Sequence, residues 1–125
     1  MDQMVDVFRE SDTAALIDKM VRTFVGFWAT DPQVMRRLLG MAALDPEIAQ
    51  GIHARDARRP RIALEILKRA SSTRHVKRGG GQQRTTADVL GMLTSSETYD
   101  VLARAGHTEA QIVATLTRLA HCVID

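Results

Sequence analysis

Histidine and cysteine are the residues of this 125-residue chain that could bind a metal or form a reactive thiolate. None of His53, His75, His107 and His121 stands at a metal-ligand spacing, such as H-E-x-x-H, from another histidine, a cysteine or an acid. Cys122 follows His121, but adjacent residues on a helix point about 100° apart. No basic residue in helical register would activate the thiol. The sequence therefore predicts neither a metal site nor a catalytic cysteine.

Serine and glycine could support hydrolysis or phosphate binding. Ser95 and Ser96 have no base close in sequence and no G-x-S-x-G elbow around them. The glycines at 79–81 lack the preceding strand and the Gly-Lys-Ser/Thr ending of a phosphate-binding loop. With no acid–base pair and no activated nucleophile, we expect a protein that is not an enzyme and has no cofactor.

Helices must position whatever residues do act. Apolar residues recur at helical spacing through most of the chain, and no alternating run indicates a strand. Asp31-Pro32 and Asp45-Pro46 each combine a capping residue with proline at the first helical position. Pro60 should kink or split the second of these helices near Arg59, before it ends at about Ala70. We expect an all-α fold of about six helices.

The C-terminal third predicts a helical hairpin. A polar notch at residues 94–96 interrupts an amphipathic helix and predicts a kink or a second cap. Gly106 suits a left-handed helix stop, and Thr108 with Gln111 fits a capping box. One face of the last helix is apolar: Ile112, Leu116, Leu119 and Val123.

Positive charge is concentrated in the middle of the chain. Residues 53–84 contain ten Lys or Arg and two Asp or Glu. We interpret this region as a solvated helix face followed by a flexible basic loop over residues 70–85, with Thr85 or Thr86 capping the next helix. Nucleic-acid binding is an alternative, although no aromatic residue interleaves with the basic ones. That alternative would use Arg74, Lys77, Arg78 and Arg84.

Two arginines of this region share a helical stripe with apolar residues. Arg55 or Arg59 could therefore point inward, beside Ile52 and Ile62. A buried guanidinium needs a carboxylate partner, for which Glu97 or Asp100 are candidates.

The chain carries no recognisable targeting signal. Its only cysteine cannot form an internal disulfide, which fits a reducing cytoplasm. The first residues are acidic and lack the basic start of a signal peptide, and no apolar run approaches the ~20 residues of a membrane span. We expect residues 1–125 to form one cytoplasmic domain without a membrane segment.

Several segments together resemble the C-terminal ligand-binding domain of tetracycline-repressor-like (TetR family) transcriptional regulators. They are FWATDP at 27–32, RRLL at 36–39, ALDPE at 43–47, the arginine-rich helix at 55–61 and LTSSETYDVL at 93–102. The resemblance runs from about Ala15 to the end. It implies an all-α domain whose last two helices form a four-helix bundle with a second copy. It also implies a small molecule bound between the middle helices, which moves N-terminal helix-turn-helix modules and releases DNA.

The resemblance leads to an expected function and expected sites. About fifteen residues precede Ala15, too few for a helix-turn-helix, so we expect an effector-binding and dimerisation domain of a repressor without its DNA-binding module. A stand-alone helical dimerisation or interaction module without a ligand is the alternative. A mainly apolar effector would contact Phe24, Trp28, Met35, Leu39, Met92, Ser95 and Tyr99. The homodimer would form through Leu102, Ile112, Leu116, Leu119 and Val123.

Overall fold

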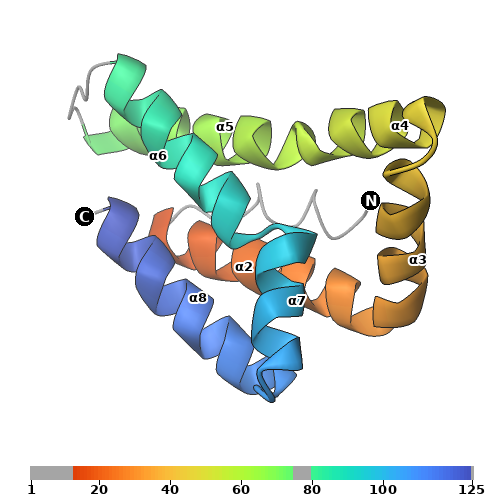
Figure 1. Ribbon diagram of the computed structural model, residues 1–125. Coiled ribbons are helices and arrows are strands. Elements are labelled where there is room, and N and C mark those ends of the chain that lie inside the picture. Colours follow the sequence, from red (N-terminus) through yellow and green to blue (C-terminus); the bar gives the residue numbers. More distant parts are fainter. Residues whose placement is uncertain (1–12, 75–79, 125) are drawn as a thin grey trace.

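Helices make up the described part of the chain. In the computed structural model, residues 13–74 and 80–124 are described. The described elements are α2 (Thr13–Thr30), α3 (Pro32–Ala42), α4 (Pro46–Asp56), α5 (Arg58–Arg74), α6 (Gly80–Leu93), α7 (Ser96–Arg104) and α8 (Glu109–Ile124) (Figure 1). These residues contain no strand, which confirms the all-α prediction.

The central helix is α2, which contacts α3, α5, α7 and α8. In Figure 1, α8 lies along α2, α5 and α6 lie side by side, and α3 and α4 form the corner that joins α2 to α5. The core contains residues of α2, α3, α5, α6, α7 and α8, among them Ile17, Met20, Ile66, Leu90 and Ile112. The exception is α4, which contributes no buried residue.

Aspartate followed by proline starts two helices as predicted. The Asp31 carboxylate accepts a hydrogen bond from the backbone N–H of Val34 at 3.2 Å. The Asp45 carboxylate accepts one from Glu47 at 2.9 Å. Each bond satisfies one of the amide donors that a helix start leaves without an intrahelical partner.

Local signals also set the ends of the C-terminal hairpin. Ser95 caps α7 by accepting a hydrogen bond from the Thr98 N–H at 3.2 Å, so the polar notch is a second helix start. Gly106 has a φ of 97°, in the left-handed region that favours glycine. The backbone N–H of Thr108 donates to the Gln111 side chain at 2.9 Å, and its hydroxyl accepts from the Gln111 N–H at 3.2 Å. All three predictions are confirmed.

Pro60 divides the middle helix as expected. α4 ends at Asp56 and α5 begins at Arg58, which places Pro60 in the first turn of α5. A proline is tolerated there because first-turn amides have no intrahelical acceptor.

The basic loop predicted over residues 70–85 is wrong for most of its length. α5 continues to Arg74 and α6 begins at Gly80, and residues 75–79 lie outside the described part. The predicted caps, Thr85 and Thr86, both lie inside α6. Because α6 packs along α5 and buries Gln83, tertiary contact outweighs the weak helix propensity of this segment.

Candidate functional site

Trp28 is the centre of the candidate site. It lies in the last turn of α2 and is 4% exposed. Its indole N–H donates a hydrogen bond to the backbone carbonyl of Thr94 at 2.8 Å. Thr94 joins α6 to α7, and its hydroxyl donates to the Leu90 carbonyl at 2.8 Å. The break between α6 and α7 is therefore anchored to the end of α2.

Two arginines from different helices lie against the Trp28 ring. The guanidinium carbons of Arg55, on α4, and Arg59, on α5, lie 5.8 and 5.7 Å from the ring centroid. Both distances are within the range of cation–π attraction. The α4–α5 junction is thus held to the same residue as the α6–α7 break.

Arg59 is the arginine that points inward, as one of the two was predicted to do. It is 5% exposed. Its Nε donates to the Gly91 carbonyl at 3.3 Å, and its Nη1 donates to Asp56 Oδ1 at 2.9 Å. The expectation that Glu97 or Asp100 would be its partner is wrong, because Asp56 three residues earlier supplies the carboxylate. The spacing i, i+3 is a signal that could have identified it.

Asp100 instead links α3 to α7. Its Oδ1 accepts a hydrogen bond from Arg36 Nε at 2.7 Å, and its Oδ2 lies 2.9 Å from Arg104 Nε. The Asp100 carboxylate is largely buried, whereas Arg104 is exposed. One carboxylate thus joins two positive charges, and the contact with Arg36 ties α3 to the short helix α7.

Gly91 allows α6 to approach the start of α5 closely. A Cβ atom at this position would lie 2.7 Å from Cγ of Pro60 and 3.0 Å from its Cδ. A Cβ atom essentially never lies within 3.0 Å of a non-bonded atom, and the proline ring has little freedom to move. The absence of a side chain at Gly91 therefore permits the close packing that brings its carbonyl oxygen to Arg59.

Most of the predicted ligand-binding residues lie in or against the hydrophobic core of the described chain. Trp28, Met35 and Tyr99 belong to one buried cluster, with Phe24 and Leu39 packed against it. Ser95 is buried, and its hydroxyl is engaged as the α7 cap, where it also donates to the Thr98 hydroxyl at 3.1 Å. Met92 is 57% exposed, so its side chain is mostly in solvent rather than in the cluster.

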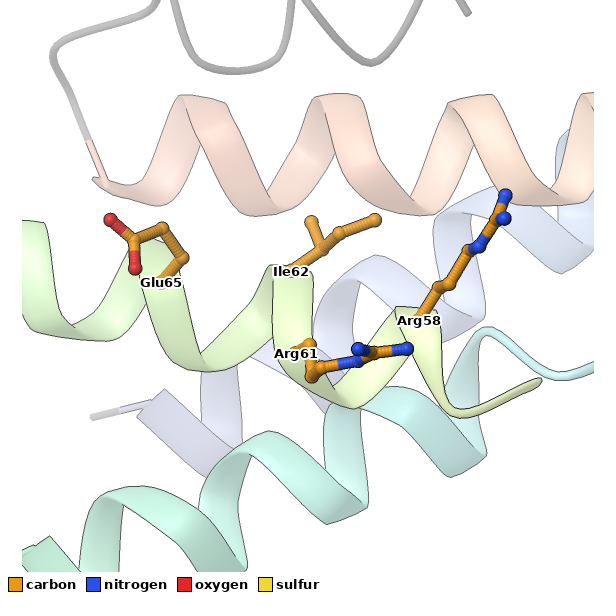
Figure 2. Close-up of a pocket in the computed structure, with 4 residues that line it drawn as sticks. All are labelled: Arg58, Arg61, Ile62 and Glu65. Carbon is orange, nitrogen blue, oxygen red and sulfur yellow. The ribbon is translucent and has the colours of Figure 1, made fainter. Parts of the chain in front are cut away.

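Open depressions in the described surface lie away from these residues. One is formed on α4 by Ala49, Gln50, His53 and Ala54. Another is formed on α5 by Arg58, Arg61, Ile62 and Glu65, as Figure 2 shows. None of the predicted ligand-binding residues lines either depression.

Two of the predicted dimer-interface residues are buried inside the chain itself. Ile112 and Leu116 are each 1% exposed because α8 packs on α2 and α6 of the same chain, so neither offers surface to a second copy. Leu102 and Val123 are half-buried, and Leu119 is 45% exposed. Sequence reasoning did not single out Val101, which is 68% exposed on α7.

The histidines and the cysteine do not assemble a reactive site in the described residues. His121 Nε2 lies 2.6 Å from Asp18 Oδ1, which links α8 to α2. His53, His107 and Cys122 are exposed, and His75 lies outside the described part. No group of three or more potential metal-binding side chains occurs within residues 13–74 and 80–124.

No described helix is long and apolar enough to cross a membrane. Comparison of the chain with protein-family models, with curated proteins and with solved structures finds no match. The site geometry and the sequence resemblance are therefore the basis of any functional assignment.

Proposed function

We propose that this chain is the effector-binding and dimerisation domain of a TetR-like transcriptional regulator, and that it senses a small, mainly apolar molecule in the cytoplasm. The observation that carries this proposal is the convergence on Trp28. The Trp28 ring is contacted by Arg55 and Arg59, and its indole N–H is bonded to Thr94. Met35 of α3 and Tyr99 of α7 belong to the same hydrophobic core. Apolar surroundings with a few fixed polar groups are typical of small-molecule sites.

The polar contacts around this cluster give the proposal a mechanism. A ligand that moves Trp28 would break its hydrogen bond to the Thr94 carbonyl and release the start of α7. The Arg36–Asp100 contact would carry the same displacement to α3. A ligand shifts the equilibrium between the arrangement with this hydrogen bond and the arrangement without it only if it binds the two with different affinities. A ligand that displaces the Trp28 ring would bind the second arrangement more tightly.

The same domain would dimerise through the outer face of the C-terminal hairpin. Val101 on α7 and Leu119 on α8 are large apolar residues exposed there, with Leu102 and Val123 half-buried. Control of DNA binding would require a helix-turn-helix module outside the described helices.

The second candidate is a helical dimerisation module without a ligand. The observation that favours it is that the polar groups expected to bind a ligand are already hydrogen-bonded within the chain: Ser95 caps α7, and the Trp28 N–H donates to Thr94. An effector would have to replace these bonds as it enters. Methionine at position 35 could repack around it at low cost, because its side chain is flexible.

Native mass spectrometry of the purified chain separates the two candidates. The effector-binding proposal expects a dimer that retains an additional small mass. Met35→Ala should reduce the fraction carrying that mass, whereas Met41→Ala, at an exposed position of the same helix, should not. A bare dimer that also fails to bind an apolar anilinonaphthalene dye would favour the ligand-free module, and a bare monomer would contradict both.

A further inference from the structure

Charged residues occupy one face of α5. At 100° per residue, their positions fall within an arc of about 100°. The buried residues of the same helix point to the other side, among them Ala63, Ile66 and Leu67. The exposed members of this charged row are Arg58, Arg61, Glu65, Lys68 and Arg69.

Three cations of this row keep their charge unpaired within the described residues. Glu65 pairs with Arg69 at 3.3 Å, which leaves Arg58, Arg61 and Lys68 without an ion-pair partner there. Arg61 Nε donates to the carbonyl of Ala57, a neutral group. Figure 2 shows Arg58 and Arg61 extending from α5 near Ile62, and both arginines are exposed. With a rise of 1.5 Å per residue, the row from Arg58 to Lys68 is about 15 Å long.

The surroundings of the row distinguish between polyanionic partners. The exposed large apolar residues of the described chain lie on other elements and none lies on α5. The apolar residues beside the row, Ile62 and Leu64, are half-buried. A protein partner would therefore find little apolar surface as an anchor, and a lipid surface would find no fully exposed apolar side chain to insert. A single nucleic-acid strand would find no aromatic ring on which its bases could stack. A duplex backbone needs none of these features, because it presents regularly spaced phosphates.

We propose that the charged row of α5 binds the phosphate backbone of a nucleic-acid duplex, without sequence preference, through Arg58, Arg61 and Lys68. One strand presents a phosphate about every 3.4 Å along the axis, so a row of about 15 Å passes about four of them. Each guanidinium can bind a phosphate through two N–H groups, and the ammonium acts as a point charge. This binding requires neither an effector nor a dimer, so it stands apart from the function proposed above.

The test is fluorescence anisotropy with a labelled DNA duplex of about two helical turns, measured over a series of salt concentrations. The combined variant Arg58→Gln, Arg61→Gln, Lys68→Gln should bind at least about tenfold more weakly at low salt. The slope of log K against log salt should become shallower by about 3, because each lost contact removes about 0.9.

A control variant with the same net charge separates the row from general attraction. Arg22, Arg37 and Arg118 are exposed on α2, α3 and α8 and have no ion-pair partner among the described residues. Their combined replacement by glutamine should leave affinity and slope unchanged. Equal weakening by both triple variants would overturn the proposal, as would the absence of any binding by the parent chain.

A variant that is expected to bind more tightly keeps the proposal testable even if the triple variant misfolds. Glu65→Gln removes the only acid of the row at an exposed position and should tighten duplex binding about twofold or more. Unchanged or weaker binding would count against the row. Binding to phosphatidylserine vesicles without binding to the duplex would also overturn the proposal, in favour of a lipid surface.

Discussion

The indole N–H of Trp28 is hydrogen-bonded at 2.8 Å to the carbonyl oxygen of Thr94, a residue 66 positions later in the chain. The carbonyl belongs to the junction where α6 ends and α7 begins, and the indole belongs to the last turn of α2. A single buried hydrogen bond thus joins two helix ends that are distant in sequence.

Removing this bond should destabilise the fold. Trp28→Phe retains an aromatic ring but leaves the Thr94 carbonyl without its indole donor, so we expect the free energy of unfolding to fall by about 2 kcal/mol. Met41→Leu, at an exposed position of α3, should change it by no more than about 0.5 kcal/mol. Urea unfolding followed by circular dichroism measures both. Equal effects would show that the bond contributes little.

Position 91 should require glycine, because any side chain there would collide with Pro60. In Gly91→Ala, overpacking against Pro60 costs about 1–3 kcal/mol, whereas the better helix propensity of alanine returns about 1 kcal/mol. We expect a net loss of up to about 2 kcal/mol. Gly51→Ala has no atom within 4 Å of the added carbon and should stabilise α4 by about 0.5–1 kcal/mol. Thermal unfolding should show shifts of opposite sign, and shifts of the same sign would contradict the close approach.

Arg59 and Arg55, which lie at similar distances from Trp28, should contribute very differently to the free energy of unfolding. Arg59→Gln leaves the buried Gly91 carbonyl and Asp56 without their donor, so we expect a loss of about 2–4 kcal/mol. Arg55→Gln removes only an exposed cation–π contact, worth about 0.5–1 kcal/mol. Both variants change the net charge equally, so denaturant unfolding compares them directly. Similar losses would place the main stabilisation in the ring contacts.

Leucines one turn apart on α8 should separate the core of the chain from the proposed interface. Leu116→Ala removes a buried side chain and should lower the free energy of unfolding by about 2–5 kcal/mol. Leu119→Glu places a charge on the exposed face, so it should leave the protomer folded and dissociate the dimer. Urea unfolding measures the first effect, and sedimentation equilibrium measures the second. A Leu119→Glu protein that remains a dimer would exclude this face from the interface.

The predictions that held depend on residues close in sequence. Asp31-Pro32 and Gly106 specify helix boundaries through their own backbone and capping preferences, so their neighbours along the chain are sufficient. Helix at 80–84 could not be predicted in this way, because its stability comes from packing against α5.

The candidate site was only partly predictable for a related reason. Periodicity correctly placed Ile112 and Leu116 on an apolar face, but it cannot tell whether such a face meets the same chain or a second copy. It likewise cannot pair Trp28 with Thr94, since that contact depends on the path of the chain between them.

The lack of any buried residue in α4 has a consequence for the motions of the molecule. Local unfolding is cheapest where few apolar contacts are lost, so α4 amides should exchange with deuterium well before those of α2, which buries six side chains. Mass spectrometry of peptic fragments would show this order, and equal protection of the two helices would contradict it. Because Arg55 lies on α4, each local unfolding of α4 would remove its guanidinium from the Trp28 ring and leave the other contacts of the indole in place.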